Sequence, residues 1–252
     1  MDCFVVILLG LCIGSFLNVC IYRIPREESI GFPPSHCTSC GYKLKIYDLI
    51  PILSFVILKG KCRGCKEKIS FQYPIIELIN GVLYLLIYLQ YGVSMGTIKF
   101  MLLTSIMIVI GMIDLKTQFV FSSTTIVAGV IGIAFIVFQW ITEEKFPLDN
   151  VIGGLIGLGL IGLIVVLTRG MGDGDIEIAA VAGLFIGVKA TIFMLFTAFI
   201  LGGIVGTFLL LKNKKGKEEM AFGPYLAMGT ILAIFIGNQL IRTYLEIYFN
   251  YV

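Results

Sequence analysis

Long apolar stretches separated by short polar segments make up most of this chain. A helix needs about 20 apolar residues to cross the hydrocarbon core of a bilayer, and seven stretches approach or reach that length. They are Val5–Tyr22, Pro74–Gln90, Ile98–Ile113, Thr125–Ile141, Val151–Thr168, Ile192–Leu211 and Leu226–Ile241. A shorter stretch, Ile176–Val188, is followed closely by the next one, with Lys189 between them. The pattern predicts an all-α polytopic membrane protein with about eight transmembrane helices.

Composition supports a lipid environment. Hydrophobic residues make up 58% of the 252 residues and charged residues 14%, and the mean hydropathy is +0.99. Because a soluble domain carries about 25% charged residues, this chain lacks the polar side chains needed to cover a surface in water. The lipid bilayer is therefore its predicted solvent. A net charge of +3 is too small to indicate nucleic-acid binding, so we expect no nucleic-acid partner.

The polar residues after the first stretch divide the chain into three predicted segments. Residues 1–22 are expected to form a retained transmembrane helix, because the acidic Asp2 stands where a signal peptide carries basic residues and no small-x-small cleavage site follows. Residues 23–72 are polar enough and long enough to form a small domain inserted after this helix. Residues 73–252 are predicted to form the membrane core.

The basic residues predict the orientation of the protein in the membrane. With eight spans, fifteen of the 19 Lys and Arg residues fall in loops on one side. Nine of these lie in the segment from Arg23 to Lys68, and four more lie between Lys212 and Lys217. Since basic loops stay in the cytoplasm, we expect the inserted domain to be cytoplasmic and both termini to lie outside.

Four cysteines in the inserted domain are spaced as metal ligands. They form two Cys-x-x-Cys pairs, Cys37 with Cys40 and Cys62 with Cys65, with 21 residues between the pairs. Four thiolates from two such pairs can surround Zn²⁺ as a tetrahedron and leave no open position for catalysis. Two disulfides are the alternative, but disulfides seldom persist on the reducing side of a membrane. The spacing therefore predicts a structural zinc site.

Two aspartates stand out among the few carboxylates near the apolar stretches. Asp114 lies at the predicted cytoplasmic end of the third stretch, and Asp175 ends the run Gly170-Met-Gly172-Asp173-Gly174-Asp175 where the short stretch begins. Ionisable groups at membrane depth usually mark function, although each could simply flank a helix at the interface. A carboxylate at a helix C-terminus opposes the helix dipole, so another group must stabilise Asp114.

If the two aspartates meet, their chemistry is that of an aspartic protease. Like charges that lie close cannot both ionise, so one proton is shared. The ionised carboxyl group then takes a proton from water while the protonated one polarises a peptide carbonyl. Gly172 and Gly174 would support this chemistry by letting a substrate backbone approach closely and by permitting positive φ angles.

The order of the motifs resembles one family over nearly the whole chain. Gly14-Ser-Phe-Leu-Asn-Val-Cys-Ile-Tyr-Arg-Ile-Pro25 resembles the first-helix signature of the bifunctional type IV prepilin peptidases and N-methyltransferases, which are Gly-x-Gly-Asp membrane aspartyl peptidases. The cysteine pairs follow in the family's order, and after them come Tyr73-Pro74-Ile-Ile-Glu77, Asp114-Leu115, the Gly-x-Gly-Asp ending at Asp175, and Phe222-Gly-Pro-Tyr-Leu-Ala-Met-Gly229.

The resemblance implies two reactions. The first is cleavage of the leader peptide from type IV prepilins or pseudopilins on the cytoplasmic side of the cell membrane, with Asp114 and Asp175 as the catalytic pair. The second is N-methylation of the new N-terminal residue with S-adenosylmethionine as methyl donor. No Rossmann-like alternation of strands and helices supports the second reaction independently. Glu77 could contact the new ammonium group or the methyl donor, or it could be a carboxylate favoured by a helix N-terminus.

The chain departs from the family's pattern at two places near the aspartates. Glu177 stands two residues after Asp175, where the family commonly has Lys, which leaves the pH optimum open. Val120-Phe-Ser-Ser123 replaces an Ile-Pro-Asp-like turn, and we expect Ser122 or Ser123 to cap the next helix instead. A peptidase for other membrane substrates is one alternative function. A proton-coupled carrier is another, although no inverted repeat supports it. The oligomeric state is not predicted.

Overall fold

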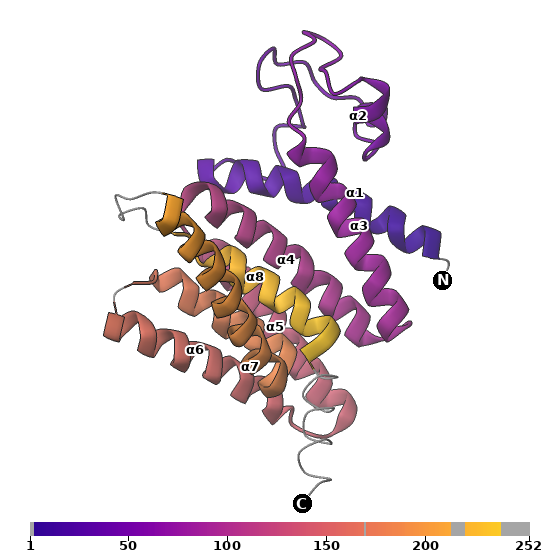
Figure 1. Cartoon of the computed structure of the whole chain (residues 1–252). Coiled ribbons are helices and arrows are strands. Elements are labelled where there is room, and N and C mark those ends of the chain that lie inside the picture. Colours follow the sequence, from indigo (N-terminus) through magenta and orange to yellow (C-terminus); the bar gives the residue numbers. More distant parts are fainter. Residues whose placement is uncertain (1–2, 169, 213–219, 238–252) are drawn as a thin grey trace, which may run out of the picture. The chain divides into compact units, whose positions relative to one another are not determined.

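A computed structural model describes residues 3–168, 170–212 and 220–237 of the chain (Figure 1). Its elements are α1 Cys3–Arg23, η1 Ile24–Arg26, η2 Ile46–Asp48, α2 Leu53–Ile57, α3 Gln72–Tyr91, α4 Met95–Thr117, α5 Ser122–Glu143, α6 Leu148–Thr168, α7 Asp173–Lys212, α8 Gly223–Leu232 and η3 Ala233–Gly237. The described residues contain no β-strand, which confirms the predicted all-α class. The chain divides into two compact units, residues 1–105 and 106–252, and α4 crosses the boundary.

Six of the described helices are long and apolar enough to cross a membrane: α1, α3, α4, α5, α6 and α7. This finding agrees with the predicted multi-pass class, and the helices match the predicted stretches within a few residues at most ends. The count falls below the eight expected for two reasons. The last apolar helix that is described, Gly223–Gly237, is short, and part of the predicted stretch Leu226–Ile241 lies outside the described residues. The stretches Ile176–Val188 and Ile192–Leu211 are joined in α7.

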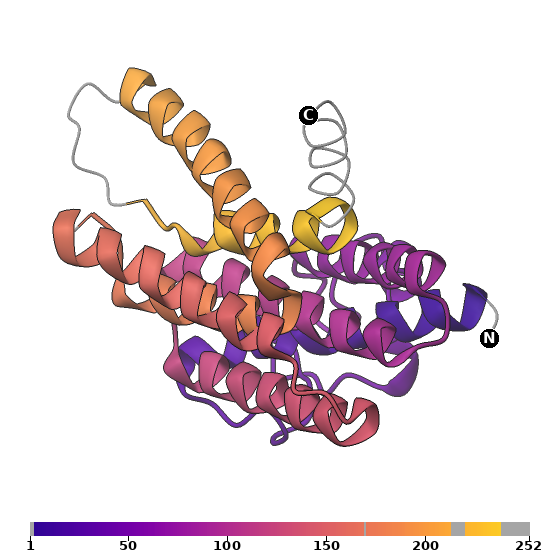
Figure 2. The same cartoon turned by 90° about the horizontal axis from the view of Figure 1, so that it is seen from below.

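The two predicted stretches in α7 are nevertheless separate helical segments, because α7 is broken at Gly187 (Figure 2). Gly187 has φ 77° and ψ 177°, a conformation that residues with a Cβ rarely adopt. The Asn150 side chain of α6 donates hydrogen bonds to the carbonyls of Leu184 (2.9 Å) and Phe185 (3.1 Å), which lose helical partners at the break. The break is therefore stabilised by contacts with α6. It lies two residues before Lys189, the charged residue that separates the two apolar stretches in the sequence.

In the unit of residues 106–252, α6 and α7 pack backbone to backbone. A Cβ atom on Gly157 would lie 2.3 Å from the carbonyl oxygen of Ala179, and one on Gly183 would lie 2.3 Å from that of Gly153. Small residues allow this approach, which is a common way for membrane helices to associate. The contact fixes the first half of α7, the segment that carries Asp175, against α6.

In the unit of residues 1–105, α1 and α3 cross in close contact (Figure 1). A Cβ atom on Gly14 would lie 2.7 Å from the Cα of Glu77, so glycine is needed at this crossing. The buried Asn18 side chain donates to the carbonyl oxygen of Tyr73 at 3.1 Å, and Asn80 donates to that of Gly10 at 2.7 Å. The first bond holds the start of α3 against the end of α1, from which the polar insert emerges, and the second joins the two helices nearer their middles.

The insert between α1 and α3 contains the same tight turn twice. In the first turn the N–H of Cys37 donates to Tyr42 O (2.9 Å), and in the second the N–H of Cys62 donates to Glu67 O (2.8 Å). Each turn contains a residue with positive φ four positions after its first cysteine, Gly41 (φ 70°) or Lys66 (φ 63°). The repeated backbone conformation directs both cysteines of each pair toward one point.

Candidate active site and metal centre

Asp114 is buried in the last turn of α4, with 4% of its surface exposed. Its Oδ2 accepts a hydrogen bond of 2.9 Å from the N–H of Gly223, the first residue of α8. The N-terminus of a helix carries partial positive charge and unpaired N–H groups, so it stabilises a carboxylate. Asp114 lies at a helix C-terminus, where a carboxylate needs another group to stabilise it. The N–H of Gly223 at the start of α8 is that group.

Asp175 is the third residue of α7 and is 5% exposed. Its Oδ2 accepts a hydrogen bond of 3.2 Å from the N–H of Gly172, and its own N–H donates to Gly172 O at 3.1 Å. The carboxylate thus accepts a hydrogen bond from the N–H of Gly172, which has no partner within the helix. The third helical residue of a capping box plays the same part. The bond holds the Asp175 side chain close to the start of α7.

Both aspartates belong to the unit of residues 106–252, and they lie close enough for their charges to interact. Each carboxylate accepts a backbone N–H at its Oδ2. Two buried carboxyl groups whose charges interact favour a state in which one of them stays protonated, because ionising both would place like charges together out of water. Such a pair can bind a water molecule with its ionised member and a carbonyl oxygen with its protonated member.

The glycines near the aspartates make contacts within the protein that the sequence did not predict. Neither Gly172 nor Gly174 has a positive φ, so the expected use of that conformation was wrong. Gly172 donates its N–H to Asp175, and Gly174 makes room for Val120, whose Cβ would lie 2.4 Å from a Cβ at position 174. Gly174 is therefore required by the packing of the site.

Gly223 is the residue that the reasoning from sequence missed. A Cβ atom there would lie 2.5 Å from Oδ2 of Asp114, so the hydrogen bond needs a glycine at this position. The Gly-Pro pair at the start of a helix, within the segment Phe222–Gly229 that carried the resemblance, was a signal for it.

Glu177 and the residues before it also differ from expectation. The residue that precedes α5 is Phe121, which makes no side-chain capping bond, so neither Ser122 nor Ser123 caps this helix as expected. The hydroxyl of Ser122 instead donates to Glu177 Oε1 at 3.4 Å, and that of Thr125 donates to Glu177 Oε2. Glu177 therefore joins α7 to α5 beside the aspartates.

The four predicted metal ligands come together as one cluster. The Sγ atoms of Cys37, Cys40, Cys62 and Cys65 all lie within 4.8 Å of one another. Cys37 and Cys65 are 3.9 Å apart, and Cys40 and Cys62 are 4.0 Å apart. Four sulfurs at 2.3 Å from a tetrahedral Zn²⁺ would be separated by about 3.8 Å. The cluster therefore has the size and donor set of a four-thiolate metal site.

The backbone of the first turn prepares one of these thiols for a metal. Hydrogen bonds from the N–H groups of Cys40 and Ser39 lower the pKa of the Cys37 thiol to about 6. Metal ligands are thiolates, so this turn favours the form of Cys37 that binds a cation.

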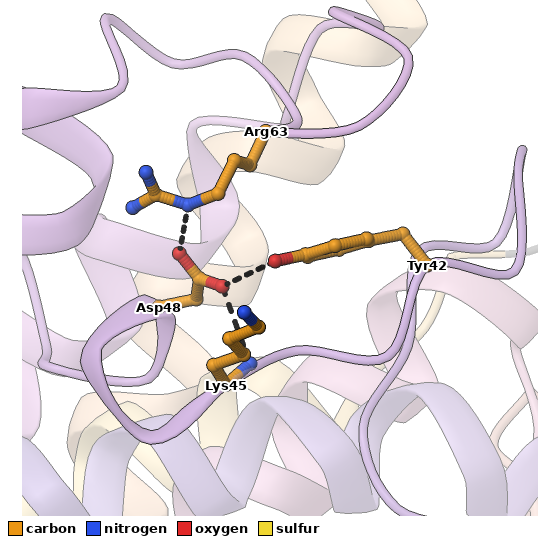
Figure 3. Close-up of polar contacts among 4 residues, drawn as sticks. All are labelled: Tyr42, Lys45, Asp48 and Arg63. Carbon is orange, nitrogen blue, oxygen red and sulfur yellow. Dashed lines mark hydrogen bonds and ion pairs between the residues drawn. The ribbon is translucent and has the colours of Figure 1, made fainter.

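An ion pair between a buried aspartate and a partly exposed arginine joins the two cysteine turns independently of any metal (Figure 3). Oδ1 of Asp48 accepts a hydrogen bond of 2.8 Å from Nε of Arg63, which lies between Cys62 and Cys65. Oδ2 accepts bonds from the N–H of Lys45 (3.2 Å) and the hydroxyl of Tyr42 (3.4 Å), both of which follow the first pair. Although burial alone would raise the pKa of Asp48, these donors lower it below its ordinary value.

Glu77 lies in the second turn of α3. The helix dipole stabilises a carboxylate only within the first turn, so the helix N-terminus is not the reason for a carboxylate at this position. The residue is 7% exposed. Its Oε2 accepts a hydrogen bond of 2.7 Å from the N–H of Ile52, and the Ser15 hydroxyl also bonds to this carboxylate. Ile52 has φ 59°, a strained conformation for a β-branched residue. Glu77 therefore anchors a strained part of the insert to α3.

Comparison with known proteins gives two family matches. Residues 8–91 match the bacterial peptidase A24 N-terminal domain, and residues 101–207 match the type IV leader peptidase family. The first range contains the four cysteines and Glu77, and the second contains Asp114 and Asp175.

Curated relatives match almost the whole chain. A prepilin leader peptidase/N-methyltransferase of Bacillus subtilis (strain 168) is 32% identical over 248 residues, which cover 96% of this chain and 97% of the relative. An enzyme of the same name from Neisseria gonorrhoeae is 32% identical, with 92% and 89% covered, and one from Pseudomonas putida is 29% identical, with 95% and 92% covered. No solved structure gives a significant match.

Proposed function

This chain belongs to the type IV leader peptidase family, and we propose on that basis that it is a membrane aspartyl endopeptidase and N-methyltransferase. It removes the leader peptide of type IV prepilins or pseudopilins and methylates the new N-terminal residue. The observation that carries the peptidase proposal is the pair of buried carboxylates, Asp114 and Asp175, whose charges interact.

In the proposed reaction, Asp114 and Asp175 share one proton. The ionised carboxylate removes a proton from a water molecule, whose oxygen attacks the scissile carbonyl carbon. The protonated carboxyl group donates a hydrogen bond to the carbonyl oxygen, where negative charge develops. The peptide C–N bond then breaks as the leaving nitrogen receives a proton. The N–H groups of Gly223 and Gly172 support this chemistry because each holds one aspartate in a fixed orientation.

We propose that Cys37, Cys40, Cys62 and Cys65 hold one structural Zn²⁺. The sulfur separations of 3.9 and 4.0 Å support a tetrahedral four-thiolate site. With four protein ligands the ion has no position left for a substrate, so it stabilises the insert and takes no part in either reaction. S-adenosylmethionine is the proposed methyl donor, in keeping with the N-methyltransferase named among the relatives.

The proposed arrangement in the cell membrane places the insert and both aspartates on the cytoplasmic side. Its support is the excess of Lys and Arg in the loops that would share that side. The three segments, residues 1–22, 23–72 and 73–252, then act as a first helix, a cytoplasmic zinc domain and a membrane peptidase core. A prepilin would present its charged leader to the cytoplasm while its apolar helix stays in the lipid.

The experiment that tests this function uses the purified full-length protein in detergent. A prepilin is incubated with it in the presence and absence of S-adenosylmethionine, and the products are analysed by mass spectrometry. We expect the leader to be removed in both samples and a mass increase of one methyl group in the first alone. An intact prepilin in both samples would contradict the proposal.

A further inference from the structure

A cavity of about 390 Å³ lies in the unit of residues 1–105, lined only by residues between Ser15 and Glu77. Its walls come from the end of α1, the start of α3 and the insert. Cavities that bind small molecules usually have volumes of 300–1,000 Å³, so this one can hold a nucleoside-sized ligand. Asp114 and Asp175 do not line it, and the peptidase chemistry therefore leaves it without a use.

The cavity has a firm wall built by a buried arginine. Arg23, at the end of α1, is 6% exposed, and its guanidinium donates to three backbone carbonyls of the following loop. They belong to Ser29 (2.8 Å), Ile30 (3.2 Å) and Pro33 (2.6 Å). Since these bonds fix the loop before any ligand arrives, the cavity is largely preformed, as small-molecule sites usually are.

The charged groups that line the cavity are not all balanced. Asp48 forms an ion pair with Arg63 at 2.8 Å. Glu77 is also buried, but the groups that bond to it, the N–H of Ile52 and the Ser15 hydroxyl, are neutral. Within the described part of the chain, no Lys, Arg or His is among the groups that act on the Glu77 carboxylate. A buried carboxylate without a cation favours a ligand that brings positive charge.

We propose that this cavity is the methyl-transfer site and that Glu77 is the carboxylate that binds the positive charge of the reactants. The proposal rests on the proposed N-methyltransferase function. Methyl transfer to an amine involves a single positive charge that moves. After the new N-terminal ammonium has lost a proton to solvent, the amine lone pair attacks the methyl carbon. The electron pair of the carbon–sulfur bond stays on sulfur, which leaves a neutral thioether and a methylated ammonium.

One carboxylate can therefore interact with the charge before and after the transfer. The charge arrives on the sulfonium of S-adenosylmethionine and leaves on the nitrogen of the product, so Glu77 can bind either cation. Aromatic side chains in the lining, Tyr22, Phe55 and Tyr73, offer faces for the adenine ring. The apolar Val19 and Leu58 line the same cavity.

The test measures binding rather than turnover. S-adenosylmethionine and S-adenosylhomocysteine have nearly the same shape, but only the first carries the sulfonium charge. Their affinities are measured by calorimetry for the full-length protein in detergent and for Glu77→Gln, whose amide oxygen can still accept the bond from Ile52. We expect Glu77→Gln to weaken binding of S-adenosylmethionine by about tenfold or more. Binding of S-adenosylhomocysteine should change by less than about threefold.

Two further variants serve as controls. Val19→Phe fills the cavity and should weaken binding of both nucleosides by about tenfold or more. Glu28→Gln makes the same chemical change as Glu77→Gln at an exposed position of the lining and should alter neither affinity. The zinc content and the size-exclusion elution profile of each variant report whether it is folded. If Val19→Phe does not fold, the comparison of Glu77→Gln with the parent protein decides the test.

A third ligand identifies which cation Glu77 binds. If Glu77→Gln leaves both nucleosides unaffected but weakens binding of a cleaved peptide with a free N-terminus, and not of its acetylated form, the charge is that of the amine. Parent-like affinity of Glu77→Gln and of folded Val19→Phe for all three kinds of ligand would overturn the proposal. Failure of the parent protein to methylate a cleaved prepilin would instead refute the proposed methyltransferase function.

Discussion

The carboxylate of Asp114 depends on one backbone group, the N–H of Gly223, which lies 109 positions further along the chain. A residue with a Cβ at position 223 would place that atom 2.5 Å from Oδ2 of Asp114 and push the carboxylate aside. A displacement of about 1 Å in a catalytic group can reduce a rate about 100-fold. Gly223 is therefore as important to the proposed site as the aspartate that it orients.

We predict that Gly223→Ala lowers the rate of leader cleavage by about 100-fold although both aspartates remain. Gly203→Ala is the matched control, because a Cβ at this position of α7 would have no neighbour within 4 Å. Both variants are assayed on a prepilin at equal protein concentration. A Gly223→Ala variant that cleaves as fast as Gly203→Ala would show that the bond to Asp114 has no role in the reaction.

The residues of the candidate site differ in how well the sequence predicted them. The cysteine pairs were predictable because Cys-x-x-Cys spacing produces the metal-binding turn locally, within six residues. The surroundings of the aspartates were not, because the partner of Asp114 starts another helix and the partners of Glu177 lie on α5. Contacts between distant parts of the chain leave no periodicity in the sequence from which to infer them.

At the scale of elements, the two cysteine turns behave as one unit. The pair Asp48–Arg63 joins them at 2.8 Å, but the four thiols come within 4.8 Å of one another and need a cation to balance their charge as thiolates. Folding of the insert and metal binding should therefore be one equilibrium.

We predict one zinc ion per chain in the purified protein and its loss in Cys37→Ser. Removing one of four ligands leaves three, and the insert, residues 24–71, should become sensitive to proteases because metal binding supplies part of its folding free energy. Elemental analysis measures the metal and limited proteolysis measures the loosening. Cys12→Ser, an exposed cysteine of α1 outside the cluster, is the control and should keep its zinc. Purified active protein without zinc would refute the assignment of the metal.

The contact between α6 and α7 is the element-scale support of Asp175. We predict that Gly157→Ala lowers the midpoint of thermal unfolding, because its Cβ would lie 2.3 Å from the carbonyl oxygen of Ala179. Overpacking of this kind costs about 1–3 kcal/mol. Gly159→Ala, two residues further along α6, would meet no atom within 4 Å and should be neutral or slightly stabilising. Equal midpoints for the two variants in detergent would contradict the close packing of these helices.

The lengths of the apolar stretches predicted the bounds of the helices well. They predicted less well where a helix is interrupted. The observed α6 begins three residues before the predicted stretch and ends at the same residue, since the bilayer sets the length of an apolar span. The break in α7 lies at Gly187 rather than at Lys189. A charge suggested the break, but a backbone conformation that suits glycine and the side chain of Asn150 from α6 produce it.

At the scale of the whole molecule, each candidate site lies within one of the two units. The aspartate pair belongs to residues 106–252, and the cysteine cluster and the cavity with Glu77 belong to residues 1–105. The two family matches divide the chain at nearly the same place, since one ends at residue 91 and the other begins at residue 101. This division supports the proposal that cleavage and methylation use different side chains.

The measurement that tests the central claim most directly follows both reactions in Asp114→Asn, Asp175→Asn and the double variant. Asparagine is nearly isosteric with aspartate but cannot take up or share the proton, and general acid–base catalysis alone is worth about 10²–10⁴-fold. Because the two carboxyl groups act as one unit, each single variant should cleave a prepilin about as slowly as the double variant. All three should still methylate a peptide whose leader has already been removed. If Asp175→Asn cleaves within about tenfold of the parent protein, the aspartate pair is not the catalytic centre.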